Sequence, residues 1–215
     1  MSTQAPERSA SELAQGARGI QLGLRAELVR DVTRMWPRLN FADLGSTWPA
    51  WLQVMSVLLR RYHARSVSSA ALYYQAARQS ETGDPGGPGL VLSAGTLESV
   101  WVDKSLGWSA PGVYSKLLRA DTPPPLAAQK ALVQTLGVSS RLVMDGGRRT
   151  IADTADADDA CYGYARITDG NPCRFCAMVA SRGAVYKTAA AAGESRRWHN
   201  HCGCTVAPSF TPAFA

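Results

Sequence analysis

Five cysteines and two of the three histidines gather in the last quarter of the chain. The first 160 of its 215 residues contain no cysteine. The cysteines are Cys161, Cys173, Cys176, Cys202 and Cys204, and the histidines beside the last pair are His199 and His201. The first twenty residues lack the apolar stretch of a secretory signal, so we expect a soluble protein made in the cytosol. Clustered cysteines in such a chain indicate metal or redox chemistry rather than a disulfide framework.

Two short segments carry ligand-type side chains at spacings that suit one metal ion. Cys173 and Cys176 form a Cys-x2-Cys knuckle, whose turn lets two sulfurs converge on one ion. After 22 intervening residues comes a second group made of His199, Cys202 and Cys204. Four thiolate or imidazole ligands in a tetrahedron are what Zn²⁺ prefers. The pattern therefore predicts a structural zinc site.

The ligand set stays open at this stage, because five side chains compete for four positions. His199 and His201 lie two residues apart on the same face of an extended segment, and the sequence does not choose between them. Gly203 is expected to allow a sharp turn between the last two cysteines. Disulfides between the two groups, or reduced cysteines in a core, are the alternatives. Cys161 falls outside the spacing and is predicted to be a small buried residue.

Patterns of common catalytic sites are missing from the sequence. It has no His-Glu-x2-His, no Gly-rich loop ending in Lys-Ser/Thr and no Gly-x-Ser-x-Gly. Cys202 or Cys204 beside His199 is a weak candidate for a nucleophile. A zinc ion with four protein ligands leaves no open position for catalysis. We therefore expect no enzymatic activity.

The chain is basic, with a net charge of +6 and a pI of about 9.3. The excess comes from both ends: residues 1–80 hold ten arginines against five acids, and residues 161–215 hold six basic residues against two acids. A basic surface favours nucleic acid or an acidic partner, although solubility alone would also explain it. No run of about 18 apolar residues exists, so no membrane span is expected.

The chain divides by composition into an arm, a body and a tail. Residues 1–19 are expected to be a flexible arm. Residues 20–160 are expected to be a helical body with an irregular insertion at about 80–124. Residues 161–215 form a module rich in Gly, Cys, Arg and aromatic residues. The predicted fold class is α+β, a mostly helical body with a small β-rich, C-terminal Cys/His zinc-knuckle module.

Apolar residues at helical spacing predict three helices in the body. They cover residues 20–36, a stretch from a cap at Ser46 or Thr47 to near Gln79, and about 125–160. The first two are expected to pack antiparallel. The third contains glycines at 137, 146 and 147 that are expected to break it.

Shorter features of the body give further expectations. Residues 90–95 and 97–103 are predicted to be short strands or extended segments. The acidic stretch at 153–159 is predicted to be a solvated helix end. His63, on the second helix, is predicted to be a surface histidine. The six tryptophans are expected mostly in a core or an interface.

The tail carries four short motifs in a fixed order. They are Tyr164-Ala165-Arg166, Pro172-Cys173-x2-Cys176-Ala-Met, Ser181-Arg182-Gly183-x-Val185-Tyr186 and His199-x2-Cys202-x-Cys204. In these motifs, over roughly residues 160–208, the chain resembles the phage Mu F-like minor head proteins, the head-morphogenesis family of tailed bacteriophages, and their actinobacteriophage members in particular. Many relatives have Pro after the histidine where this chain has Asn200.

The resemblance implies a minor capsid protein of the virion. Such proteins lie inside the head near the portal vertex, after assembly in the host cytoplasm. Their implied partners are the portal protein, the major capsid protein or both, with nonspecific contact to packaged DNA and no membrane. The alternative from the residues is a zinc-knuckle DNA nuclease or DNA-binding protein, which the run His199-Asn200-His201 and the basic charge suggest.

Overall fold

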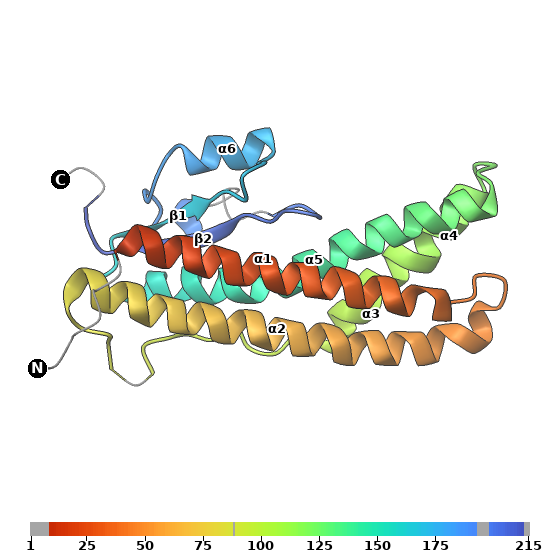
Figure 1. Ribbon diagram of the computed structural model, residues 1–215, viewed down its shortest axis with the longest axis horizontal. Coiled ribbons are helices and arrows are strands. Elements are labelled where there is room, and N and C mark those ends of the chain that lie inside the picture. The colour runs from red at the N-terminus through yellow and green to blue at the C-terminus, as the bar shows by residue number, and fades with distance from the viewer. Residues whose placement is uncertain (1–8, 88, 193–197, 213–215) are drawn as a thin grey trace, which may run out of the picture.

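Three long helices lie side by side in the computed structural model (Figure 1). It describes residues 9–87, 89–192 and 198–212. The long helices are α1 (Ala10–Met35), α2 (Leu44–Thr82) and α5 (Pro124–Ala157). A 3-10 turn at Trp36–Arg38 lies between α1 and α2, which run antiparallel, whereas α5 runs in the same direction as α2 (Figure 1). The three predicted helices and the antiparallel first pair are confirmed.

The first helix starts ten residues earlier than apolar spacing predicts. Ser9 and Glu12 form a capping box at its start. The Ser9 backbone N–H donates to Glu12 Oε2 at 2.8 Å, and the Glu12 backbone N–H donates to Ser9 Oγ at 3.3 Å. This exchange satisfies two of the open donors of a helix start. The second half of the arm expected at 1–19 is therefore helical, and residues 1–8 lie outside the described residues.

The ends of α2 also differ from the prediction. Its cap is Asp43, whose Oδ1 accepts from the backbone N–H of Ser46 at 3.3 Å. The helix continues three residues beyond Gln79 and stops at Gly83, which has φ 76°. A left-handed residue of this kind ends a helix at little cost when it is glycine.

The glycines of α5 do not break the helix. Gly146 and Gly147 face α2, and their lack of a side chain lets the two helices approach closely. A Cβ on Gly146 would lie 2.8 Å from His63 Nε2, and one on Gly147 would lie 2.8 Å from Ser66 Oγ. The Gly147 backbone N–H donates to Ser66 Oγ at 3.1 Å. His63 is consequently buried, with 6% of its surface exposed, and the prediction of a surface histidine is wrong.

Part of the expected irregular insertion is helical. Residues 90–98 have no helix or strand, but α3 (Ser99–Gly107), a π-helical turn (Trp108–Gly112) and α4 (Val113–Leu118) follow. The prediction of a strand or extended segment at 97–103 is therefore wrong. Val102 and Leu106, four residues apart, bury one face of α3 and explain the helix.

The main apolar core lies between the long helices and α3. Its fully buried side chains share helical spacing and include Leu28, Val32, Met55, Leu59, Val102, Leu106 and Val143. Of the tryptophans, Trp51 is buried, and its indole N–H donates to the Met35 carbonyl at 3.0 Å. Trp36, Trp48 and Trp198 are partly buried, whereas Trp101 and Trp108 are exposed by 59% and 58%.

A small sheet and two short helices form the tail, which lies over the bundle near the start of α1 (Figure 1). Strand β1 (Gly163–Ile167) pairs antiparallel with β2 (Thr205–Ser209), with Gly163 opposite Ser209. Helices α6 (Arg174–Ala180) and α7 (Ala189–Ala192) lie between the strands in sequence. The α+β class, with a helical body and a C-terminal Cys/His cluster near a small sheet, is confirmed.

Asp156 and Asp159, in the acidic stretch at the end of α5, are exposed as predicted, but Asp158 is buried and anchors the tail. Asp158 is 3% exposed, and its Oδ2 accepts from the Tyr74 hydroxyl and from Arg78 Nε, each at 3.0 Å. Lys187 Nζ donates to the carbonyls of Asp158 and Cys161. Cys161 is buried as predicted. Among the described residues, no helix combines the length and apolar character needed to cross a membrane.

Candidate metal centre

The fold brings the two ligand-bearing segments together. Cys173 is the N-cap of α6, and its Sγ accepts from the Cys176 backbone N–H at 3.4 Å. The pairing of β1 with β2 carries the segment before β2 to the same place. As a result Cys176 Sγ lies 3.6 Å from Cys202 Sγ, although 26 residues separate them.

The cluster consists of two overlapping groups that share Cys176. In each group the ligand atoms lie within 4.8 Å of one another; the groups are Cys173, Cys176, His199 and Cys176, Cys202, Cys204. All five cysteines are free thiols. The alternative of disulfides between the segments does not describe this structure, because a bonded pair of sulfurs would lie about 2.05 Å apart. The cluster is positioned to hold a metal ion.

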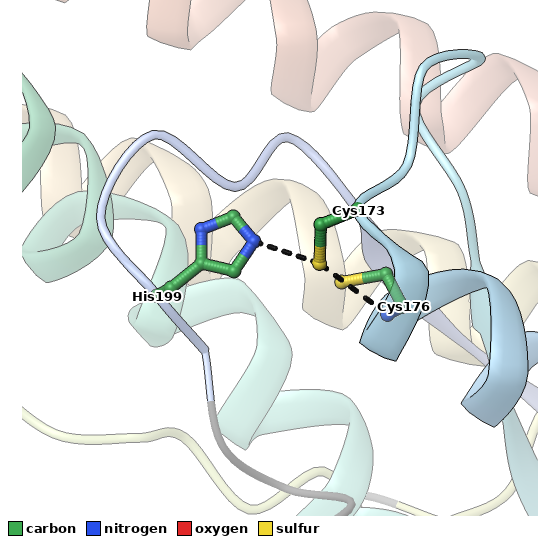
Figure 2. A group of neighbouring side chains, drawn as sticks. All are labelled: Cys173, Cys176 and His199. Carbon is green, nitrogen blue, oxygen red and sulfur yellow. Dashed lines mark hydrogen bonds between the residues drawn. The ribbon is translucent and has the colours of Figure 1, made fainter.

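Of the two neighbouring histidines, His199 belongs to the cluster. Its Nε2 lies 3.0 Å from Cys173 Sγ, and Figure 2 shows the ring pointing at that sulfur. Its Nδ1 lies 2.6 Å from the Asn200 carbonyl. Metal-binding histidines typically donate their second ring nitrogen to such an acceptor. The Asn200 side chain is held in turn by Arg141, whose Nε donates to Oδ1 at 3.1 Å.

His201 points elsewhere, toward α5. Its φ is 67°, a left-handed conformation that reverses the chain between the two histidines. A Cβ on Gly137 would lie 2.4 Å from His201 Nε2, so the ring occupies the space that this glycine leaves. Burial lowers the pKa of His201. The structure thus separates two side chains that the sequence could not distinguish.

The thiols of the cluster shift one another's pKa in opposite directions. A hydrogen bond with Cys204 and the nearby Arg148 guanidinium lower the pKa of Cys202 to about 5. The Cys176 backbone N–H, and then His199, lower the pKa of Cys173. Burial raises the pKa of Cys176 to about 11, and the adjacent Cys202 raises that of Cys204. Buried thiolates at this spacing repel one another, and a divalent metal ion would neutralise that repulsion.

Arg148, which the sequence analysis did not single out, fastens the second segment to α5. It is 3% exposed, and its Nη2 donates to the carbonyls of Cys202 and Cys204 at 2.7 and 2.8 Å. Its Nη1 pairs with Asp145 at 3.0 Å. Burial lowers the pKa of Arg148. No local pattern marks this arginine, since the adjacent Arg149 on the same helix is exposed.

A second arginine connects the sheet with the cluster. Arg166 on β1 donates from Nη1 to Cys176 Sγ at 3.2 Å. The Trp198 ring centroid lies 3.5 Å from its guanidinium carbon and 4.0 Å from that of Arg148. Cation–π contacts of desolvated guanidinium groups are among the stronger ones. The matching tail motif contained Arg166, but its contact with the sulfur required the fold.

Gly203 has a different role from the one predicted. Its φ is not among the positive values of the chain, so it does not supply a left-handed turn. Its backbone N–H donates to Asp169 Oδ2 at 3.0 Å, and a Cβ would lie 2.5 Å from that oxygen. Glycine is needed there for the close approach of the loop before α6.

The fold and the cluster define a helical-bundle protein with a Cys/His centre, and comparison with known proteins adds a family. The profile of the family described as VG15 protein matches residues 7–213. The chain therefore belongs to the VG15 protein family, a family of viral gene products, and is a bacteriophage protein. Searches of curated proteins and of solved structures found no match.

Proposed function

We propose that this phage protein is a minor capsid component that acts in head morphogenesis and lies at the portal vertex inside the head. The observation that carries the proposal is the cluster itself. It joins the Cys173–Cys176 segment to the 199–204 segment, and these are the segments whose order resembles the Mu F-like minor head proteins. Membership of a viral family supports the same assignment.

The proposal includes one structural zinc ion. Thiolates and an imidazole form a donor set that suits Zn²⁺ better than Mg²⁺ or Ca²⁺, which prefer oxygen. Cys173, Cys176 and Cys202 would supply three ligands, and His199 or Cys204 the fourth. The ion would crosslink two strand-flanking segments and leave no open position for a substrate. A role in assembly rather than turnover follows from such a closed site.

The nuclease alternative draws little support from the geometry of the histidines. His199 faces Cys173 and His201 lies against α5 at Gly137, so the two rings do not converge on a common point. Nonspecific DNA contact stays part of the proposal. Arg34 and Arg149 have side chains exposed by 78% and 64%, and a surface of this kind can contact phosphates in a salt-dependent way.

Metal analysis tests the zinc site directly. We expect one zinc per chain in protein purified without chelator, and loss of the zinc in the Cys173→Ser and Cys202→Ser variants. Cys161→Ser is the matched control, because Cys161 is buried outside the cluster. Comparison of His199→Ala with Cys204→Ser identifies the fourth ligand. A metal-free protein with unmodified thiols would contradict the proposal.

Fractionation of infected cells tests whether the protein is a component of the phage head. A tagged chain should co-purify with portal-containing procapsids, at a copy number far below that of the major capsid protein by quantitative mass spectrometry. Abundant free protein that is missing from procapsids would end the assignment. A nicking assay with Mg²⁺ or Mn²⁺, comparing wild type with His199→Ala, tests the nuclease alternative, and we expect no cleavage by either.

A further inference from the structure

Helix α3 and the π-helical turn that follows it carry an exposed aromatic face that does not pack against the bundle. Val102 and Leu106 are fully buried and account for the packing of α3 against the bundle. Trp101 and Trp108 lie seven residues apart, about two helical turns, on another face. They are exposed by 59% and 58%, more than half of the surface of each. Two large aromatic side chains held in water on one face mark a binding surface rather than a core.

These tryptophans line a groove between α3, α5 and the segment at the metal cluster. The groove measures about 490 Å³, and Lys104 from α3 and Arg141 from α5 line it together with residues 198–200. Since His199 lines this groove and also contacts Cys173, the segment that holds the cluster forms one wall of the groove. We call the groove lined by Trp101 and Trp108 the tryptophan groove.

The charge of the tryptophan groove is positive. Lys104 Nζ lies 5.8 Å from the centre of the Trp101 ring. Arg141 is held by its hydrogen bond to Asn200, and it shares the Asp145 carboxylate, at 3.9 Å, with Arg148, which lies closer to it at 3.0 Å. Among the described residues, no carboxylate lines the groove. A ligand that complements it therefore carries negative charge beside an apolar group.

We propose that the tryptophan groove docks an acidic segment of another head protein. An apolar side chain of that segment would pack on Trp101 and Trp108, and its carboxylates would pair with Lys104 and Arg141. The inference rests on the proposed function for the identity of the partner as a head protein. The groove itself supplies the surface and the chemistry.

Two other occupants fit the groove less well. A single-stranded nucleic acid also stacks on aromatic side chains, but it needs a row of cations along its phosphates, whereas Lys104 and Arg141 are the two lysine and arginine side chains that line this groove. A second copy of this chain would bring a net charge of +6 toward a positive groove. Both occupants are outcomes of the tests below.

Incorporation into procapsids tests the surface with the full chain in infected cells. Trp101→Ala should lower the amount per procapsid at least about tenfold. Leu72→Ala is the control, because Leu72 is 69% exposed on α2, outside the groove. Lys104→Glu should also lower incorporation, whereas Lys130→Glu, an exposed lysine on α5 with the same change in net charge, should not. Zinc content and melting temperature should stay unchanged in all four variants.

The outcomes separate this inference from the proposed function. If the wild-type chain is missing from procapsids, the proposed function fails. If the wild type enters and the Trp101→Ala and Lys104→Glu variants enter equally well, the proposed function stands and the groove inference is overturned.

Photo-crosslinking tests the class of partner. With a benzoylphenylalanine in place of Trp101, we expect adducts to one acidic peptide of a head protein, identified by mass spectrometry. The same group at Leu72 should not label that peptide. Adducts to nucleic acid only, adducts to copies of this chain only, or no adducts at all would each overturn the inference.

Discussion

The helical body and the Cys/His tail are stabilised by different means. The body buries a continuous apolar stripe on each of three helices, with side chains such as Leu28, Met55 and Leu59 fully enclosed. The tail has two five-residue strands, and around its cysteines the buried cluster consists of Cys176, Cys202 and Cys204. The cysteine cluster itself buries little apolar surface, so the proposed metal ion would add to the stability of this part of the tail.

The two regions share an apolar core, in which Tyr74 and Ile151 of the body pack with Val206 and Phe210 of the tail, and polar contacts add to it. Arg148 of α5 donates to the carbonyls of Cys202 and Cys204, and Lys187 of the tail donates to the Asp158 carbonyl at the end of α5. Buried polar contacts of this kind fix one relative placement, because each unpaired group would carry a desolvation cost. The body therefore acts as a scaffold on which the tail is oriented.

The largest expected effect comes from removal of the proposed zinc. A strong chelator should abolish amide protection in residues 161–212 and leave it in α1, α2 and α5, because metal binding supplies on the order of 10 kcal/mol to small zinc-dependent folds. Hydrogen exchange followed by mass spectrometry measures both regions at once. Equal protection of the tail with and without chelator would show that it folds without metal.

A cavity in the body should have the next largest effect. Leu59→Ala should lower the free energy of unfolding by about 3 kcal/mol, since Leu59 is fully buried. Val57→Ala, on the same helix at 64% exposure, should change it by less than about 0.5 kcal/mol. Urea unfolding followed by circular dichroism compares the two. Similar losses in both variants would contradict the core described here.

The contact between body and tail is tested by a pair of adjacent arginines. Arg148→Met should cost about 2 kcal/mol, because it leaves the Cys202 and Cys204 carbonyls without their donor. Arg149→Met, whose side chain is 64% exposed, is the control and should cost less than about 0.5 kcal/mol. Exchange in residues 198–212 should rise in the first variant only. If both variants behave alike, Arg148 does not fasten the tail.

The smallest expected effect is a pH dependence of the body. Burial lowers the pKa of His63 below its ordinary value of 6.5. Between 6.5 and the folded-state pKa, the unfolded chain binds a proton that the folded chain does not, so stability falls as the pH falls through this window. His63→Gln should flatten that slope.

Hydrogen exchange in α2 and α5 reports the stability of the body alone and so separates the His63 effect from any proton uptake by the cysteines. The fall of this stability with falling pH should persist in chelator-treated wild type, because His63 lies in the body. An unchanged slope in His63→Gln would exclude His63 as its source.

Local sequence patterns predicted much of the fold, and each wrong prediction has a physical cause. Apolar spacing revealed three helices, but the start of α1 depended on a capping box, Ser9 with Glu12, that precedes the apolar stripe. The sequence of residues 97–103 predicts an extended segment, and only the burial of Val102 shows that this stretch is a helix with one face against the bundle. His63 and Asp158 are polar side chains whose burial depends on a partner helix, which no window of neighbouring residues reveals.

For the metal centre, too, some features follow from local sequence and others from the tertiary structure. The sequence by itself determined that two thiol-bearing segments exist and that their spacing suits a zinc ion, because residue type and spacing are local properties. Only the tertiary structure decided that His199 and not His201 joins Cys173, and that Arg148 and Arg166 support the sulfurs. The physical reason is that a side chain's partners depend on where distant segments meet, and here the packing of the tail on α5 sets that meeting point.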